Sequence, residues 1–306
     1  MCLFNNVMTR QCNLSEINMG NVVDAADFYE RCEAAAVIGT MQAAYTEFPY
    51  LGAVTQSIVE REALIGVSMT GIASGPVLEL DMKAAAKIAE KENKRVADII
   101  GIRPAARTTC VKPAGTTSLA LGTSSGIHAW HSDYYIRRIR VGKDEAIYNH
   151  LLTNHPNLLE DEYFRPHDTA VISVPQRAPE CAILRAESAT NLLSRVKDVN
   201  RRWIRPGHKR GQNSHNISAT ISIRENEWEK VGKWMWQNRK FYNGLSVLPY
   251  DGGTYKQAPF EECTKEEYEN LLLSLKKLDL TKVIEYDDNT DLTGELACAG
   301  GACEIR

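Results

Sequence analysis

The stretch Arg107-Thr-Thr-Cys-Val-Lys-Pro-Ala-Gly-Thr-Thr-Ser118 places a strand signal directly before a helix-start signal. Three of its first five residues have β-branched side chains, which favour a strand. Pro113 and Gly115 then interrupt the extended pattern, and hydroxyl side chains follow where a helix would begin. A strand that runs directly into a helix predicts an α/β fold.

Other strand and helix signals alternate along the rest of the chain. Strands are predicted at residues 169–174 and 216–223, with a shorter one at 244–248. We expect Pro175 and Pro249 to end the first and the last of these, because proline cannot donate a backbone hydrogen bond. This alternation predicts an α/β layer or barrel with parallel strands. The predicted helices are at residues 22–45, 60–67, 82–100, 187–204, 228–238 and 264–277.

The composition is that of an ordinary globular protein. The chain has 306 residues, of which 43% are apolar and 25% charged, so it can bury a sizeable core. The formal net charge of −3 gives no reason to expect binding to a nucleic acid polymer. No signal-peptide pattern and no run of about 20 apolar residues is found, which predicts a cytoplasmic protein without a membrane span. The eight cysteines are then expected to be reduced thiols.

Two cysteines lie close together near the end of the sequence, in Cys298-Ala-Gly-Gly-Ala-Cys303. The small residues between them allow the two thiols to approach each other and close a ring. The preceding residues are rich in Asp, Asn, Thr and Gly, which predicts a flexible tail that exposes the pair. This arrangement favours thiol–disulfide exchange, whereas the alternative of a zinc site would need further ligands.

The segment from Pro113 to Ser118 is a candidate anion site. If a helix begins after Gly115, its first backbone N–H groups lack helical partners and can bind a phosphate. The hydroxyls of Thr116 and Thr117 would add donors. The glycine, lysine and hydroxyl order of a Walker loop is absent. A plain turn with a helix cap is the alternative interpretation.

Two further segments carry reactive side chains but predict little by themselves. Cys12 is a single cysteine in a mixed segment and, taken alone, is predicted to be structural. His128, His131 and Asp133 are of the types that bind metals, but the surrounding glycine and aromatic residues suit a loop. No strong further ligand lies near them in the sequence, so we expect no metal site there.

Six segments, taken in order, resemble class II ribonucleotide reductases, which depend on adenosylcobalamin. No single motif is specific, but their shared order is, and the resemblance spans nearly the whole chain. The segments are Cys12-Asn-Leu-Ser-Glu-Ile17, Leu64-Ile-Gly-Val-Ser-Met-Thr-Gly71, Lys112-Pro-Ala-Gly-Thr-Thr-Ser118, Gly122-Thr-Ser-Ser-Gly-Ile-His128, Gly244-Leu-Ser-Val-Leu-Pro-Tyr-Asp251 and Cys298-Ala-Gly-Gly-Ala-Cys303.

This resemblance implies the carboxy-terminal part of the ten-stranded α/β barrel of ribonucleotide reductases, with a flexible C-terminal tail. Residues 1–257 would form the partial catalytic barrel, residues 258–285 a helical extension, and residues 286–306 the redox tail. The implied activity is the reduction of ribonucleoside di- or triphosphates to 2′-deoxyribonucleotides. A thiyl radical formed with adenosylcobalamin would start the reaction.

The resemblance also implies roles for particular residues. Cys12 matches one of the two barrel cysteines that reduce the ribose and become a disulfide. Cys298 and Cys303 match the C-terminal pair that re-reduces this disulfide, and a thioredoxin- or glutaredoxin-type protein would in turn reduce the pair. The residues implied in binding the substrate phosphates are Pro113, Ala114, Gly115, Thr116, Thr117 and Ser118.

The region around Cys2 departs from the family pattern. Cys2 is the nearest counterpart of the radical cysteine, but the family's Asn before it and Glu after it are absent. The family's amino-terminal half, which holds the second reducing cysteine, is absent as well. We therefore expect the chain to begin inside the finger loop and to act with a separate amino-terminal reductase chain. The alternatives are an inactive truncated remnant and a stand-alone thiol-transfer or zinc-binding protein.

Overall fold

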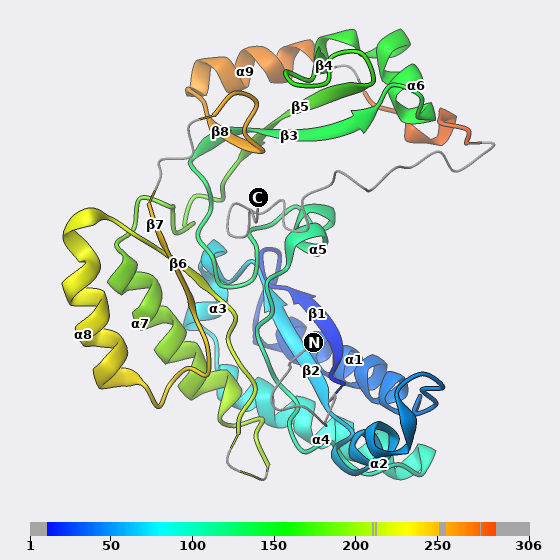
Figure 1. Cartoon of the computed structure of the whole chain (residues 1–306), viewed down its shortest axis with the longest axis vertical. Coiled ribbons are helices and arrows are strands. Elements are labelled where there is room, and N and C mark those ends of the chain that lie inside the picture. The colour runs from blue at the N-terminus through cyan, green and yellow to red at the C-terminus, as the bar shows by residue number, and fades with distance from the viewer. Residues whose placement is uncertain (1–10, 210, 212, 251–254, 276, 286–306) are drawn as a thin grey trace. The chain divides into compact units, whose positions relative to one another are not determined.

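The computed structural model describes residues 11–209, 211, 213–250, 255–275 and 277–285 (Figure 1). This part of the chain divides into two compact units. Residues up to 129 and residues 187–250 belong to the first unit, and residues 130–186 join those after 250 in the second. The second unit is thus built from a segment inserted into the first unit's sequence and from the residues that follow it.

Two pairs of parallel strands lie in the first unit. β1 (Asn13–Asn18) pairs with β2 (Ile65–Thr70), and β6 (Thr220–Ile223) pairs with β7 (Ser246–Pro249). All six residues of β2 are buried, as is typical of a parallel strand covered on both faces. β7 is exposed along its whole length, which fits its place at the edge of the pair.

Residues 107–111 join these two pairs into one array. Thr109 bridges Val67 of β2, and Val111 bridges Ile217 just ahead of β6; both bridges are parallel. The backbone N–H groups of Val67 and Val111 donate hydrogen bonds across these contacts at 2.8 and 3.2 Å. Within the described residues of the first unit, five extended segments therefore run parallel. Residues 107–111 form the middle one.

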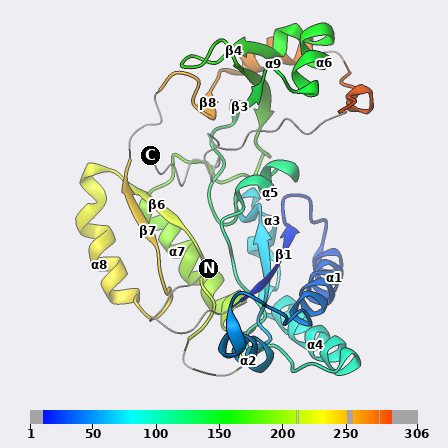
Figure 2. The same cartoon turned by 45° about the vertical axis from the view of Figure 1, so that its right-hand side comes forward.

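Helices connect and cover this array. They are α1 (Ala25–Ala43), α2 (Gly52–Glu62), α3 (Pro76–Glu79), α4 (Met82–Ile100), α5 (Gly115–Ala120), α7 (Ala189–Val199), which a π-helical turn over Asn200–Ile204 follows, and α8 (Trp228–Asn238). α1 packs against α4, β1 and β2, while α7 packs against β6 and α8, as Figure 2 shows. The rings of Phe28 on α1 and Trp203 stack with centroids 5.9 Å apart, and both side chains are fully buried.

The described residues of the second unit form an antiparallel sheet and two α-helices. The strands, in spatial order, are β4 (Leu159–Asp161), β5 (Thr169–Arg177), β3 (Tyr134–Gly142) and β8 (Phe260–Glu262). Every pairing in this sheet is antiparallel. α9 (Lys265–Ser274) packs on β3 and β5, and α6 (Ala146–Asn154) packs on β3.

Most of the predicted helices are confirmed. Those predicted at residues 82–100 and 228–238 are α4 and α8, with the same bounds. Those predicted at 22–45 and 264–277 are present as the shorter α1 and α9. None of the helices in the described part of the chain is long and apolar enough to cross a membrane.

The helix predicted at residues 60–67 is wrong. α2 ends at Glu62, Ala63 adopts a left-handed backbone with φ of 42°, and β2 begins at Ile65. Parallel pairing with β1, fifty residues away in the chain, decides the conformation of this segment. The helical spacing of its apolar residues is a local signal, and tertiary pairing overrides it.

The strand predicted at residues 169–174 is present but differs in two respects. Pro175 does not end it, since β5 continues to Arg177, and its partner β3 is antiparallel rather than parallel. β4 covers β5 only over residues 170–172. Among the described residues, no strand therefore pairs with Pro175 on the side of β5 that faces β4. Such edge positions tolerate proline.

The boundary expected at residue 257 differs from the observed division. Residues 130–186, expected within the barrel part, lie in the second unit with the residues after 250. The physical reason is shared packing: β8 pairs with β3, and α9 packs on β3 and β5, although β8 and α9 are far from these strands in the chain. The segment expected to be a helical extension thus completes a sheet.

Candidate active site

Two cysteine sulfurs approach the same glycine of β2. Cys12 lies one residue before β1, and Cys110 lies in the extended segment on the other side of β2. A Cβ atom placed on Gly66 would lie 3.0 Å from Cys12 Sγ and 2.8 Å from Cys110 Sγ. Both distances are shorter than a van der Waals contact, so only glycine leaves room for the two sulfurs. The first unit therefore brings two thiols together over one strand.

A histidine contacts the first of these thiols. Cys12 Sγ lies 3.7 Å from Nε2 of His215, and Nδ1 of the same ring lies 3.1 Å from the carbonyl oxygen of Thr109. A carbonyl oxygen only accepts hydrogen bonds, so Nδ1 carries the ring hydrogen and Nε2 is left as the acceptor. Burial lowers the pKa of His215 to about 4, and the hydrogen bond to Thr109 opposes this shift. The ring is therefore neutral at pH 7 and can accept the Cys12 S–H.

The second thiol is held in its protonated form. Cys110 is buried, and burial raises its pKa well above the ordinary value for a thiol. The nearby Cys12 raises this pKa further, whereas Lys112 lowers it. Because the thiolate is the reactive form of cysteine, the raised pKa makes Cys110 a weak nucleophile.

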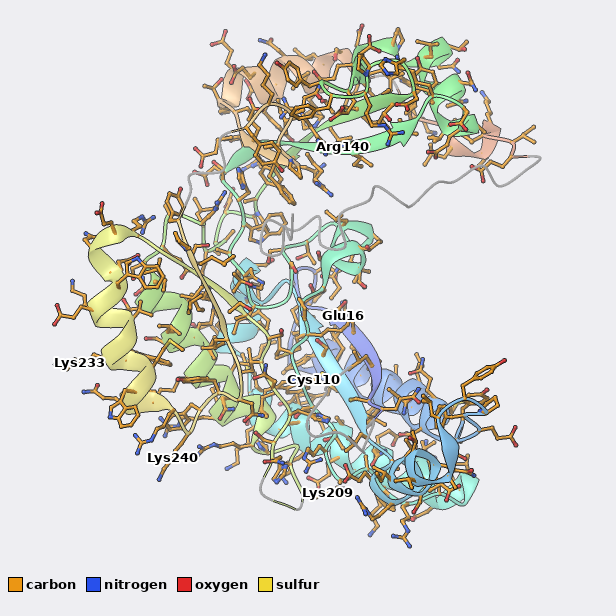
Figure 3. The ribbon with its side chains drawn as sticks, in the orientation of Figure 1. Glu16, Cys110, Arg140, Lys209, Lys233 and Lys240 are labelled. Carbon is orange, nitrogen blue, oxygen red and sulfur yellow. The ribbon has the colours of Figure 1, made fainter. Side chains whose placement is uncertain are left out.

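An ion pair between a half-buried lysine and a largely buried carboxylate lies in the same region. Nζ of Lys112 is 3.1 Å from Oε2 of Glu16, whose side chain is 4% exposed. Burial raises the pKa of the Glu16 carboxyl, while Lys112, Thr117 and Ser68 favour its charged form and oppose the shift. Figure 3 labels Glu16 and Cys110 in the same part of the first unit. The pair ties β1 to the segment that leads into α5, and it acts electrostatically on Cys110.

The predicted phosphate segment does begin a helix. α5 starts at Gly115, and no side chain among the described residues caps its first turn. The backbone N–H of Ala114 donates to Ser125 Oγ at 3.1 Å, and the buried Ser118 donates its hydroxyl to the Gly115 carbonyl at 2.9 Å. Ala114 and Ser118 thus shape the turn. The N–H groups from Gly115 to Thr117 have no intrahelical partner, so an anion can reach donors there.

The two histidines considered as metal ligands have other partners. His128 accepts a hydrogen bond from the Thr220 backbone N–H at Nε2, 3.0 Å away, and its Nδ1 lies 3.0 Å from the Ser125 carbonyl oxygen. His131 stacks on Phe260 with centroids 5.6 Å apart. The described residues hold no group of three or more His, Cys, Asp and Glu side chains that suits a metal ion.

Three of the predicted site residues lie outside the described residues. These are Cys2, the counterpart of the radical cysteine, and the C-terminal pair Cys298 and Cys303. Of the other predicted site residues, Cys12 lies beside Gly66 of β2, and the phosphate segment follows Lys112, which pairs with Glu16 of β1.

Sequence reasoning missed His215, Cys110 and Gly66. His215 is 203 residues from Cys12 in the chain, and no motif connects the two. Cys110 lies inside the strand predicted at residues 107–111. Pairing of that strand with β2 would have indicated that Cys110 lies near Gly66. Gly66 lies in a predicted motif, but its importance depends on the two flanking sulfurs.

Comparison with known proteins gives a consistent set of relatives. No family model matches the chain. It is 25% identical to an adenosylcobalamin-dependent ribonucleoside-triphosphate reductase of Lactobacillus acidophilus over 83% of its own length. The corresponding values are 24% over 96% for the enzyme of Lacticaseibacillus paracasei and 28% over 73% for that of Euglena gracilis. Its curated homologues are adenosylcobalamin-dependent ribonucleoside-triphosphate reductases.

A solved structure of a B-12 dependent (class II) ribonucleotide reductase has the same fold. The TM-score is 0.75 at 21% sequence identity, and the match covers 90% of this chain and 41% of that one. The chain spans 38% of the length of the L. acidophilus reductase and 43% of that of L. paracasei. The likeness confirms a mixed α/β fold of the class II reductase type. The full ten-stranded barrel stays a prediction.

Proposed function

We propose that this chain provides the carboxy-terminal part of the catalytic barrel of an adenosylcobalamin-dependent ribonucleotide reductase. The main support is the match of this chain to a class II reductase over 90% of its length. The chain also contains the parallel array in which the Cys12 thiol lies beside β2. The reaction would convert ribonucleotides to 2′-deoxyribonucleotides. Triphosphates are the substrates named for the homologues, and either di- or triphosphates would fit the proposed role.

Cys12 is the proposed reducing thiol of this part of the barrel. It and a second cysteine outside this chain would be oxidised to a disulfide, and their two electrons and two protons would replace the 2′ hydroxyl, which leaves as water. Adenosylcobalamin supplies the radical chemistry when it is bound, and thiols are the groups in this site that can exchange hydrogen atoms and electrons with it. Cys2 is proposed as the counterpart of the radical cysteine.

The turn into α5 is the proposed phosphate-binding segment, comprising Pro113 to Ser118. Its first turn has no side-chain cap among the described residues, and Thr116 is exposed there. Backbone N–H groups at a helix start favour anions through both hydrogen bonds and the helix dipole. Lys112 and Thr117 are engaged by Glu16, and Ser118 donates to the Gly115 carbonyl, so the proposed binding depends on the backbone N–H groups and the Thr116 hydroxyl.

Two partners follow from the proposal. We propose a separate amino-terminal reductase chain that would supply the rest of the barrel implied by the family resemblance. A thioredoxin- or glutaredoxin-type protein would reduce the pair Cys298 and Cys303, which would in turn reduce the barrel disulfide.

Co-expression tests the proposal. The chain is purified with and without an amino-terminal reductase chain, and deoxynucleotide formation is measured with adenosylcobalamin, a ribonucleotide and a dithiol. We expect turnover from the complex and none from this chain alone. Cys12→Ser in the complex should abolish turnover, while the matched control Cys181→Ser, at an exposed site in the second unit, should retain it. Turnover by this chain alone, or by the Cys12→Ser complex, would contradict the proposal.

A further inference from the structure

We propose that His215 is a positioning residue for Cys12: its Nε2 holds the thiol by a hydrogen bond and accepts the thiol proton when the sulfur reacts. The inference rests on the proposed function, in which Cys12 is a reducing thiol. It deepens that function by naming the group that receives the proton of Cys12 during thiol–disulfide exchange, the step by which Cys12 would be re-reduced.

The histidine ring is fixed at both nitrogens. Thr109, in the extended segment beside β2, accepts a hydrogen bond from Nδ1 at 3.1 Å, and Cys12 Sγ lies 3.7 Å from Nε2. A hydrogen bond at one ring nitrogen sets the tautomer and directs the lone pair of the other. His215 itself lies two residues before Ile217, where the chain bridges Val111. The parallel array therefore holds both the ring and the carbonyl that orients it.

The charges around the ring keep it in the accepting form. Burial has the largest effect and lowers the pKa of His215 to about 4; Arg107 and His208 lower it further, and Glu62 raises it. Arg107 lies 3.6 Å from Glu62, so each charge partly offsets the other. Between about pH 5 and 8 the ring is neutral, because its pKa lies below that range. Nε2 is thus available to the thiol at physiological pH.

The proton transfer is a single balanced step. In thiol–disulfide exchange the S–H bond of Cys12 breaks and its proton moves to Nε2. The electron pair of its sulfur forms a bond to one sulfur of a disulfide, whose S–S bond breaks as the other sulfur leaves as a thiolate. The resulting imidazolium keeps its Nδ1–H bond to Thr109. The same groups run in reverse when Cys12 leaves a disulfide as a thiolate and takes the proton back.

Alkylation of Cys12 in the full chain tests this without any turnover. Iodoacetamide forms a carbon–sulfur bond to Cys12 as iodide leaves, and mass spectrometry of the Cys12 peptide gives the rate at each pH. An imidazole that accepts the proton gives a pH-independent rate below the thiol pKa, in addition to the thiolate rate above it. His215→Gln should lose this plateau and react about tenfold more slowly at pH 7, a modest loss for removal of a general base.

Controls separate this effect from unfolding and from reagent chemistry. His167→Gln, at an exposed histidine of the second unit, should leave the Cys12 profile unchanged, and the exposed Cys181 reports the reagent rate in each sample. Circular dichroism checks that each variant is folded. A His215→Gln profile that superimposes on that of the unmodified chain would overturn the proposal.

A second measurement does not depend on the folding of that variant. Nitrogen-15 NMR of the unmodified chain should show His215 as a neutral ring with hydrogen on Nδ1, and Cys12→Ser should shift its Nε2 resonance. A ring protonated at Nε2 at pH 7 would overturn the proposal. Both readouts are independent of nucleotide reduction, so failure of the co-expression experiment leaves them interpretable, and their failure leaves the proposed function open to its own test.

Discussion

At the scale of single residues, Gly66 controls the space that the two sulfurs occupy. An ideal Cβ at this position would lie 2.6 Å from Leu14 Cδ2, in addition to its short contacts with Cys12 and Cys110. The strand is central and fully buried, so neighbouring side chains have little room to move. Alanine has the better intrinsic fit to a strand, but the steric conflict is larger than that gain.

Gly66→Ala should therefore lower the free energy of unfolding by about 1–3 kcal/mol, the usual cost of overpacking a buried site. Urea denaturation followed by circular dichroism measures the change. The matched control is Gly232→Ala in α8, where nothing lies within 4 Å of the new Cβ. This control should raise stability by up to about 1 kcal/mol, because alanine is the better helix former. An unchanged or more stable Gly66→Ala chain would show that β2 adapts to the added methyl group.

At the scale of elements, one buried amide connects two helices to the central segment. Asn93 on α4 donates through Nδ2 to Thr40 Oγ1 on α1 at 2.8 Å. Its Oδ1 accepts from the backbone N–H of Ala105 at 2.9 Å, just ahead of the 107–111 segment. Asn93 is 1% exposed, so water cannot replace either partner. The Asn93 side chain thus holds the connection between α4 and the middle strand of the array in place.

Asn93→Ala should lower the free energy of unfolding by about 2–3 kcal/mol, because it leaves the buried Ala105 N–H without its acceptor and removes the hydrogen bond to the Thr40 hydroxyl, which still donates to Ala36. Thermal and urea denaturation give the change. The exposed Lys94→Ala on the same helix should stay within about 0.5 kcal/mol of the original chain. If both variants lost the same stability, the hydrogen bonds of Asn93 would not be what holds α4 in place.

At the scale of the whole molecule, the proposed thiol chemistry requires a second pair of cysteines. Cys298 and Cys303 lie outside the described residues, so their role is argued from the sequence and its resemblance alone. The barrel disulfide that contains Cys12 would need an internal reductant, and a pair in a polar tail is suited to exchange.

Cys298→Ser combined with Cys303→Ser should abolish steady-state turnover driven by a thioredoxin-type reductant in the co-expressed complex. A single turnover from the pre-reduced complex should remain, because Cys12 is unchanged. Rapid-quench analysis of the first product equivalent separates the two. Cys263→Ser, at a half-buried site of the second unit, is the control and should retain both activities. An equal loss of single and multiple turnovers would contradict the shuttle role.

Local sequence signals were sufficient to predict the bounds of a helix whose capping residues are its neighbours in the sequence. α4 begins where Asp81 accepts hydrogen bonds from Lys83 and Ala84 N–H groups, and it ends at Gly101 in a left-handed conformation. These caps depend on neighbours in the sequence, so the predicted bounds of 82–100 were correct. The same reasoning failed at 60–67, where strand pairing at long range decides the structure.

The sequence by itself determined the α/β character, the turn at Pro113 to Ser118, and the order of motifs that resembles class II reductases. These follow from residue types and short spacings, which act over a few bonds. Only the tertiary structure decided that Cys12 and Cys110 meet beside Gly66, that His215 contacts Cys12, and that residues 130–186 belong to the second unit. Parallel strands bring together residues that are far apart in the chain, and no local pattern encodes which strands become neighbours.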